Sequence, residues 1–230
     1  FNFDQIVERR GTDSTKWDKY AGSDILPMWV ADMDFPSPKP VRDALQARVE
    51  HGVFGYSEPP AELVQLILQR LAERYDWRIN EADLVFLPGV VPGLNMACRG
   101  LARAAGNIAT VTPVYHPFLS APGFSSQCLR TLPAFYENGQ WRYPFSELEV
   151  LFQQGIDLYM LCNPHNPIGR LLTEAELTEL LALCEKYNVL ICSDEIHCDL
   201  LFDDRQHVPT AVLSDYAREH TVTLLAPSKT

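Results

Sequence analysis

The chain has 230 residues, 47% of them hydrophobic, and a formal net charge of −11. Such a chain can bury a large core, as one big domain or as one domain and part of another. Apart from the adjacent Arg9 and Arg10, its lysines and arginines are scattered singly, which together with the negative charge argues against a nucleic acid or an anionic membrane as partner. An acidic ligand would therefore need local hydrogen-bond donors.

The cysteines and the apolar runs indicate a cytoplasmic protein. The six cysteines form no CxxC pair, so reduced thiols are expected. Cys192, His197 and Cys198 lack the spacing of a zinc site, so no metal is expected. No stretch reaches about 18 uninterrupted apolar residues, and residues 1–14 are polar and of mixed charge. We therefore expect neither a membrane span nor a signal peptide.

The first third of the chain predicts an irregular segment followed by two helices. Residues 1–36 are aromatic and rich in aspartate, and two of these aspartates lie among large apolar residues in WVADMDF. A helix is predicted over residues 37–52, with Ser37 as its N-cap and apolar residues spaced three to four apart. Residues 59–77 have the pattern of a second helix.

From residue 84 onward, apolar strands alternate with helical patterns. A helix is predicted at about 91–104, and another opens at Thr173, which with Glu176 has the spacing of a capping box. Continuous apolar strands separated by helices predict a largely parallel sheet covered on both faces, hence an α/β fold. The predicted strands are 84–87, 108–112, 157–161, 189–193 and 222–225.

Two of the turns after these strands could contribute to a ligand site. Gly89, Val90 and Val91 lie between a strand and a helix start, where free backbone N–H groups suit a phosphate, although on this segment alone an ordinary βα turn is the favoured interpretation. Tyr115 follows the next strand and could stack on a flat ring or simply belong to the core or its rim.

The later turns carry an amide, a carboxylate and a lysine. Two Asn-Pro pairs stiffen CNPHNPIG, so that Asn166 could donate to a ligand, whereas His165 is interpreted as a surface residue. Asp194 ends a strand and needs a cation, which could be an arginine or a protonated ring nitrogen, and His197 could lie on the same side. Lys229 follows the last strand, where a solvated surface turn is the alternative to a ligand site.

Together these turns supply what one cofactor requires. Pyridoxal 5′-phosphate needs a lysine for a Schiff base, a carboxylate at its pyridinium nitrogen, a phosphate cup, a stacking aromatic residue and a donor near its phenolic oxygen. The residues with these properties occur in order along one predicted parallel sheet.

The motifs also resemble a known family. The chain resembles a fold-type I pyridoxal phosphate enzyme of the class I/II aminotransferase superfamily, and within it the cystathionine β-lyase (MalY/PatB) branch, from about residue 10 to its last residue. The motifs that carry the resemblance are KWDKY, MWVADMDF, FGYSEPP, PGVVPGLNMA, TPVYHPF, NPHNPIGR, SDEIHCDL and APSKT.

The resemblance implies roles for the central residues. Lys229 would form the Schiff base, and Asp194 would pair with the pyridine nitrogen. Asn166 would bind the phenolic oxygen, and Tyr115 would stack on the ring.

It also implies a phosphate site and a second subunit. The backbone of Val90 and Val91, with Ser228, would bind the phosphate. Tyr56 matches a tyrosine that reaches the phosphate of the neighbouring subunit, which implies a homodimer with shared sites. His197 stands where transaminases of the superfamily usually carry tyrosine, which favours the lyase branch.

Two departures from the family pattern are visible. Ala226 stands where many members have a phosphate-binding serine. The family also continues well beyond the lysine, so the substrate-carboxylate arginine and most of the small domain are expected past residue 230. On this basis residues 1–45 would belong to the small domain and active-site rim, and residues 46–230 to an incomplete large domain. As a separate polypeptide the chain is expected to fold poorly and to be inactive.

The resemblance therefore implies a carbon–sulfur β-lyase. It would act by α,β-elimination on L-cystathionine or a related cysteine S-conjugate, giving pyruvate, ammonia and a thiol such as homocysteine. One alternative is an aminotransferase of L-amino acids with the same apparatus, and a second is a non-catalytic regulatory protein that keeps the fold.

Overall fold

The computed structural model describes residues 2–229. The chain divides into two compact units at the Pro59–Pro60 bond. The first unit contains α1 (Thr15–Asp18) and α2 (Lys39–His51). The N-cap predicted at Ser37 is wrong, because α2 begins after Pro38 and has no side-chain cap. Prolines in the first turn lack an N–H group, which leaves fewer donors for a cap to satisfy.

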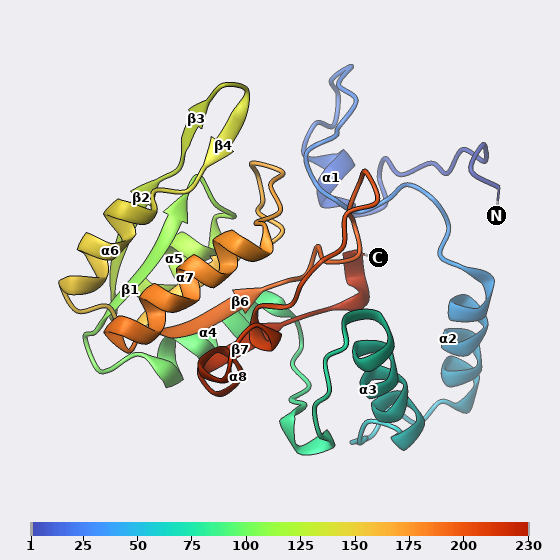
Figure 1. Cartoon of the computed structure of the whole chain (residues 1–230). Coiled ribbons are helices and arrows are strands. Elements are labelled where there is room, and N and C mark those ends of the chain that lie inside the picture. The colour runs from blue at the N-terminus through green and yellow to red at the C-terminus, as the bar shows by residue number, and fades with distance from the viewer. Residues whose placement is uncertain (1, 230) are drawn as a thin grey trace. The chain divides into compact units, whose positions relative to one another are not determined.

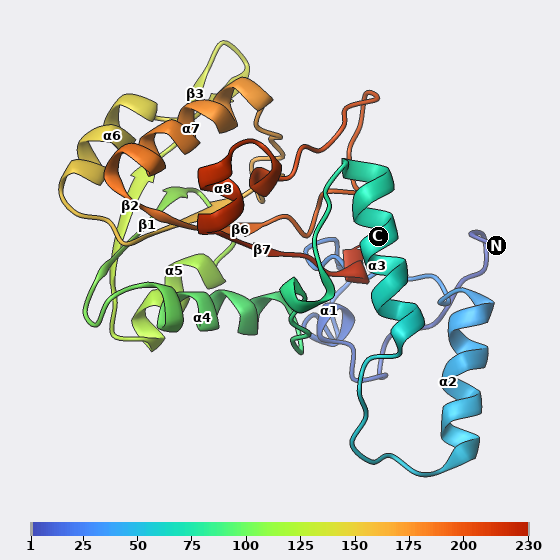
Figure 2. The same cartoon turned by 60° about the horizontal axis from the view of Figure 1, so that its bottom comes forward.

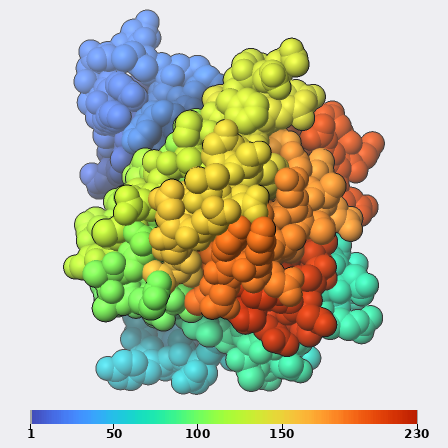
Figure 3. Space-filling view, turned by 60° about the vertical axis from the view of Figure 1, so that its left-hand side comes forward, coloured from blue at the N-terminus to red at the C-terminus, as the bar shows by residue number. Residues whose placement is uncertain are grey.

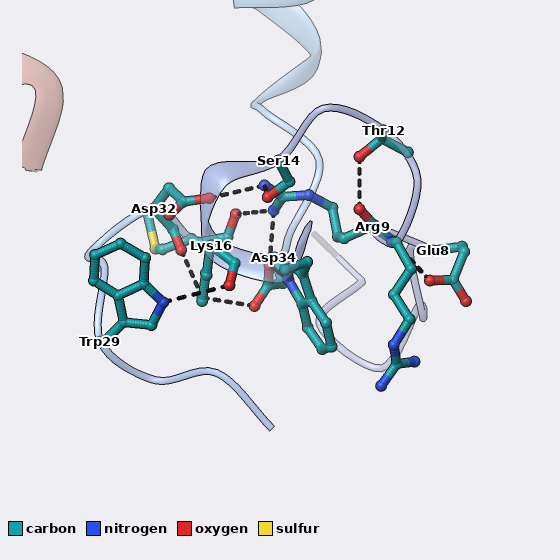
Figure 4. Close-up of polar contacts among 11 residues, drawn as sticks. Glu8, Arg9, Thr12, Ser14, Lys16, Trp29, Asp32 and Asp34 are labelled. Carbon is teal, nitrogen blue, oxygen red and sulfur yellow. Dashed lines mark hydrogen bonds and ion pairs between the residues drawn. The ribbon is translucent and has the colours of Figure 1, made fainter. Parts of the chain in front are cut away.

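A polar cluster organises the irregular part of the first unit (Figure 4). The Arg9 guanidinium donates to Asp32 Oδ2 at 2.8 Å and to Asp34 Oδ1 at 2.7 Å. Lys16 Nζ lies 2.8 Å from Asp34 Oδ2, and the Trp17 indole donates to Asp34 Oδ1 at 2.9 Å. The hydrogen bond from Lys16 is the main cause of a lowered pKa at Asp34. The aspartates of WVADMDF thus bind groups of their own unit.

The second unit is built on five parallel strands in the order β2-β1-β5-β6-β7, which confirms the predicted α/β fold (Figure 1). The strands are β1 (Asn107–Thr112), β2 (Cys128–Pro133), β5 (Leu158–Cys162), β6 (Leu190–Asp194) and β7 (Thr221–Leu224), with a separate hairpin of β3 (Phe135–Glu137) and β4 (Gln140–Arg142). The helices are α3 (Ala61–Tyr75), α4 (Val90–Leu101), α5 (Pro117–Phe124), α6 (Phe145–Gln153), α7 (Glu174–Tyr187) and α8 (Asp215–His220).

Helices cover both faces of this sheet, as predicted (Figure 2). Successive β5 residues alternate between two cores: Tyr159 packs with side chains of α6, α7 and α8, whereas Met160 packs with α4 and α5. In Figure 3, α6 and α7 form a continuous yellow and orange surface on their side of the sheet. Because β5 is buried on both faces, its sequence LYMLC is apolar apart from the Tyr159 hydroxyl.

The capping box of Thr173 and Glu176 is confirmed at the start of α7. The strand predicted at 84–87 is absent from the structure, where Val85 and Phe86 are exposed. A strand needs a neighbour for its backbone hydrogen bonds, and residues 84–87 pair with no strand among residues 2–229.

Within residues 2–229, none of the helices has both the length and the apolar character that a membrane span requires.

Candidate functional site

Four strands of the sheet end side by side, and each is followed by a residue of the predicted site. Parallel pairing places Cys162 opposite Asp194, and Asp194 opposite Leu224. The loops beyond these ends continue the pairing, because Asn163 N–H donates to Asp194 O and Glu195 N–H donates to Leu224 O, both at 3.0 Å. The carboxyl edge of the sheet is the usual ligand position in such folds.

Asp194 is the last residue of β6 and only 3% of its surface is exposed. Its Oδ1 accepts a hydrogen bond from Ile196 N–H at 3.1 Å, and it forms no ion pair with any of residues 2–229. The alternative of an arginine partner is therefore not realised within these residues. Burial raises the pKa of Asp194 to about 6, and the negative charge of Glu195 adds to the rise. Such a carboxylate fits a ligand that brings a positive charge.

Lys229 and His197 lie near each other at the same edge. Lys229 ends the 3₁₀ turn Pro227–Lys229 and is half-buried. His197 lies in a turn after β6 that is closed by Cys198 N–H donating to Glu195 O at 3.0 Å. Burial lowers the pKa of His197, and the charge of Lys229 lowers it further, so the two side chains are within electrostatic range. Ser228, beside Lys229, is exposed.

The N-terminus of α4 lies beside the end of β7. A Cβ at Gly93 would come within 2.9 Å of Leu224 Cδ2, so this glycine lets the helix approach the strand closely. Gly89 occupies the N-cap position and provides no side-chain cap for the N–H groups of Val90 and Val91. The helix start therefore presents donors and a positive dipole end suited to an anion.

Tyr115 and Asn166 lie in the loops after β1 and β5, which are neighbouring strands. Tyr115 is half-buried, its ring 5.0 Å from that of His116. The Asn166 backbone N–H donates to Cys162 Sγ at 3.4 Å, while its side-chain amide has no partner among residues 2–229. That amide is available to a ligand.

The interpretation of His165 as a surface residue is wrong. Only 2% of its surface is exposed, and both ring nitrogens make hydrogen bonds, to Tyr143 Oη and to Pro113 O. No local pattern indicates this burial, because the partners of the ring lie 22 and 52 residues away.

A buried polar cluster beside Asp194 was also missed. The Glu195 carboxylate accepts from Ser193 Oγ at 2.8 Å and from Thr210 N–H at 3.0 Å, and it lies 2.6 Å from His207 Nε2. The adjacent acidic pair in SDEIH was the available signal for Glu195, but His207 had none. Tyr56 belongs to the first unit, where its side chain is fully exposed.

A comparison with known families shows which family the chain belongs to. The model of the family described as aminotransferase class I and II matches residues 23–229. The chain belongs to this family. Among its members, the cystathionine β-lyase PatB of Bacillus subtilis (strain 168) is 38% identical over 234 residues, which cover 100% of this chain and 60% of PatB.

Solved structures of similar proteins agree with the family assignment. The crystal structure of OvoB has a TM-score of 0.93 and 42% identity, and the match covers 100% of this chain and 61% of OvoB. Cystalysin from Treponema denticola, whose crystal structure contains pyridoxal 5′-phosphate, has a TM-score of 0.93 and 28% identity over 100% of this chain and 60% of cystalysin. This family member thus spans about 60% of the length of these relatives.

Proposed function

We propose that the protein is a pyridoxal phosphate-dependent carbon–sulfur β-lyase acting on L-cystathionine or a related cysteine S-conjugate. The observation that carries the proposal is the buried Asp194 without a cation partner, at a sheet edge that also bears Lys229. The similarity to the cystathionine β-lyase PatB supports the lyase reaction within the family.

The residues at the edge have the donors and charges that the cofactor needs. Asp194 would hold a proton on the ring nitrogen, because its carboxylate is ionised above a pH of about 6 and lacks another cation. Lys229 would bind the cofactor covalently through Nζ, the Asn166 amide would donate to its phenolic oxygen, and Tyr115 would stack on its ring. When bound, pyridoxal phosphate supplies a protonated ring that accepts the electron pair left on the substrate Cα.

The phosphate would lie at the uncapped start of α4. The N–H groups of Val90 and Val91 at this helix start would donate to the phosphate, and the Ser228 hydroxyl would add a donor. The 30 Asp and Glu outnumber the 19 Lys and Arg, so the net charge of −11 gives a phosphate no long-range attraction. Backbone donors therefore provide most of the local attraction for the phosphate.

In the reaction, Lys229 would act as the general base. The substrate amino group would replace Lys229 Nζ on the cofactor, and the released Nζ would take the proton from the substrate Cα. The Cβ–S bond would then break with the sulfur leaving as a thiolate. With water, L-cystathionine would give homocysteine, pyruvate and ammonia. His197, held neutral at physiological pH by its lowered pKa, could contact the substrate side of Lys229 without adding a charge.

The test is pyruvate formation from L-cystathionine by the intact protein without an added keto acid. Sustained pyruvate over many turnovers, abolished in Lys229→Ala together with the visible absorption of the bound cofactor, is the expected result. A single conversion of the cofactor to its amine form, without further pyruvate, would instead assign the protein as an aminotransferase, which the family name also allows. Absence of any cofactor absorption would revive a non-catalytic role.

We further propose a cytoplasmic homodimer with shared sites. Residues 1–45 would belong to a small domain and site rim, and residues 46–230 to the large domain. Tyr56 would reach the phosphate of the neighbouring subunit. Mixing inactive Tyr56→Phe and Lys229→Ala proteins should restore about a quarter of wild-type activity through hybrid dimers with one intact site, on statistical mixing of a two-fold assembly. Activity that stays at the level of the separate variants would contradict shared sites.

A further inference from the structure

His165 links three separate segments of the second unit. Its ring Nε2 lies 2.9 Å from Pro113 O, in the loop after β1, and its Nδ1 bonds Tyr143 Oη, just after β4. Its backbone closes its own loop, because His165 N–H donates to Arg170 O at 2.7 Å and Gly169 N–H donates to His165 O at 2.8 Å.

The tautomer of His165 follows from these partners. The carbonyl oxygen of Pro113 can only accept, so Nε2 carries the hydrogen. Burial lowers the pKa of His165 to about 4, and the charge of Arg170 contributes, so the ring is neutral at physiological pH. Nδ1 then accepts from the Tyr143 hydroxyl, which stays protonated because burial raises its pKa well above the usual value. Each ring nitrogen therefore has one fixed role.

The position of His165 relates two residues of the proposed cofactor site. Asn166 is the next residue along the chain, and Tyr115 lies two residues after Pro113. The ring thus connects the loop that carries the amide donor to the loop that carries the stacking aromatic. An apolar residue here would remove the hydrogen bond to Pro113 O and would leave the Tyr143 hydroxyl without its partner in a buried setting.

We propose that His165 is a positioning residue that sets the distance between Asn166 and Tyr115, and so fixes how the cofactor ring is oriented in the site. The inference rests on the proposed function, since it assumes that pyridoxal phosphate binds there. It explains why a histidine, with a donor and an acceptor on opposite sides of one flat ring, occupies a buried loop position.

The experiment compares cofactor binding by variants of the intact protein. His165→Gln can still place an N–H donor near Pro113 O, whereas His165→Leu removes both hydrogen bonds. We expect the dissociation constant for pyridoxal phosphate to rise about tenfold in His165→Leu and to change little in His165→Gln, as for other residues that orient a ligand-binding group. The visible circular dichroism of the bound cofactor, which reports ring orientation, should weaken only in His165→Leu.

Two controls separate positioning from stability. His51→Leu removes an exposed histidine of α2 and should alter neither measurement. Tyr143→Phe deletes a single hydroxyl and is the substitute if His165→Leu fails to fold. We expect Tyr143→Phe to change cofactor affinity and dichroism in the same direction as His165→Leu, but by less. ¹⁵N spectra of the wild type should show the Nε2–H tautomer of His165 down to a pH of about 4.

The outcomes distinguish this inference from the function beneath it. Wild-type affinity and dichroism in a folded His165→Leu variant, or in Tyr143→Phe where that variant is the substitute, would overturn the positioning role and leave the lyase proposal intact. A wild type that binds pyridoxal phosphate but forms no pyruvate would overturn the lyase proposal. The cofactor affinity and dichroism of the His165 variants would then still decide the positioning role. A wild type that does not bind the cofactor would overturn both.

Discussion

Asp194→Asn should make the cofactor-free protein more stable at neutral pH. The folded wild type must keep a negative charge at a site that is 3% exposed and has no cation partner among residues 2–229. Asparagine has nearly the same shape, and its Oδ1 can still accept the Ile196 N–H bond. The substitution therefore removes the charge with little change in packing.

The magnitude follows from the pKa of Asp194. This pKa is about 6 in the folded protein, against an ordinary value of 3.8. Because the folded pKa is the higher one, the unfolded chain loses its proton first, and stability is lost as the pH rises from about 4 to about 6. A difference of about 2 units, at about 1.4 kcal/mol per unit, gives about 3 kcal/mol.

Urea unfolding of cofactor-free wild type and Asp194→Asn at pH 4 and pH 8 measures this effect. The free energy of unfolding of the variant relative to wild type should increase by about 3 kcal/mol between the two pH values. Asp24→Asn, at an exposed aspartate of the first unit, is the matched control and should show no such increase. If the free energies of unfolding of Asp194→Asn and wild type change by the same amount between the two pH values, burial does not destabilise the ionised carboxylate and the reasoning fails.

Three further substitutions and one control test the structure of the second unit by their effect on the free energy of unfolding. Glu195→Ala should lower it by about 3 kcal/mol at any pH near neutral, because three buried donors lose their acceptor. Gly106→Ala should lower it by about 2 kcal/mol, since the new Cβ would lie 2.1 Å from Asp157 Oδ2, whereas Gly100→Ala, with nothing within 4 Å, should be neutral or stabilising. Thr173→Ala should cost about 1 kcal/mol through loss of the capping box at α7. Equal values for Gly106→Ala and Gly100→Ala, or unchanged stability in the other two, would contradict these contacts.

Much of the second unit could be predicted because its signals are local. Each central strand is a short apolar run, and the Thr173 capping box marks the start of α7 within four residues. The strand β2 was missed because it lies at the sheet edge, where its sequence CLRTLP is half exposed and mixed in polarity. The false strand at 84–87 had the right composition, but composition does not supply a pairing partner.

The central residues of the candidate site could be predicted from the sequence, but the buried polar contacts around them could not. Asp194 and Lys229 could be singled out because one ends a strand of a parallel sheet and the other follows the neighbouring strand, so that their positions converge. The burial of His165 and the pairing of Glu195 with His207 depend on contacts between distant segments, which no local pattern records. These distant partners surround the site and determine its electrostatics.

The location of Asp194 explains how the sheet tolerates its charge. β6 is hydrogen-bonded on both sides, to β5 and β7, and apolar cores cover both of its faces, so the strand end is fixed whether or not the carboxylate is satisfied. A free energy of about 3 kcal/mol is a large part of the stability of an ordinary domain, yet it is small beside the burial of two cores. A bound group that carries a protonated nitrogen would lower the pKa of Asp194 again and recover this energy on binding. The ionised carboxylate that lowers the stability of the cofactor-free protein thus favours the cationic form of the ligand, which is the form that the proposed reaction requires.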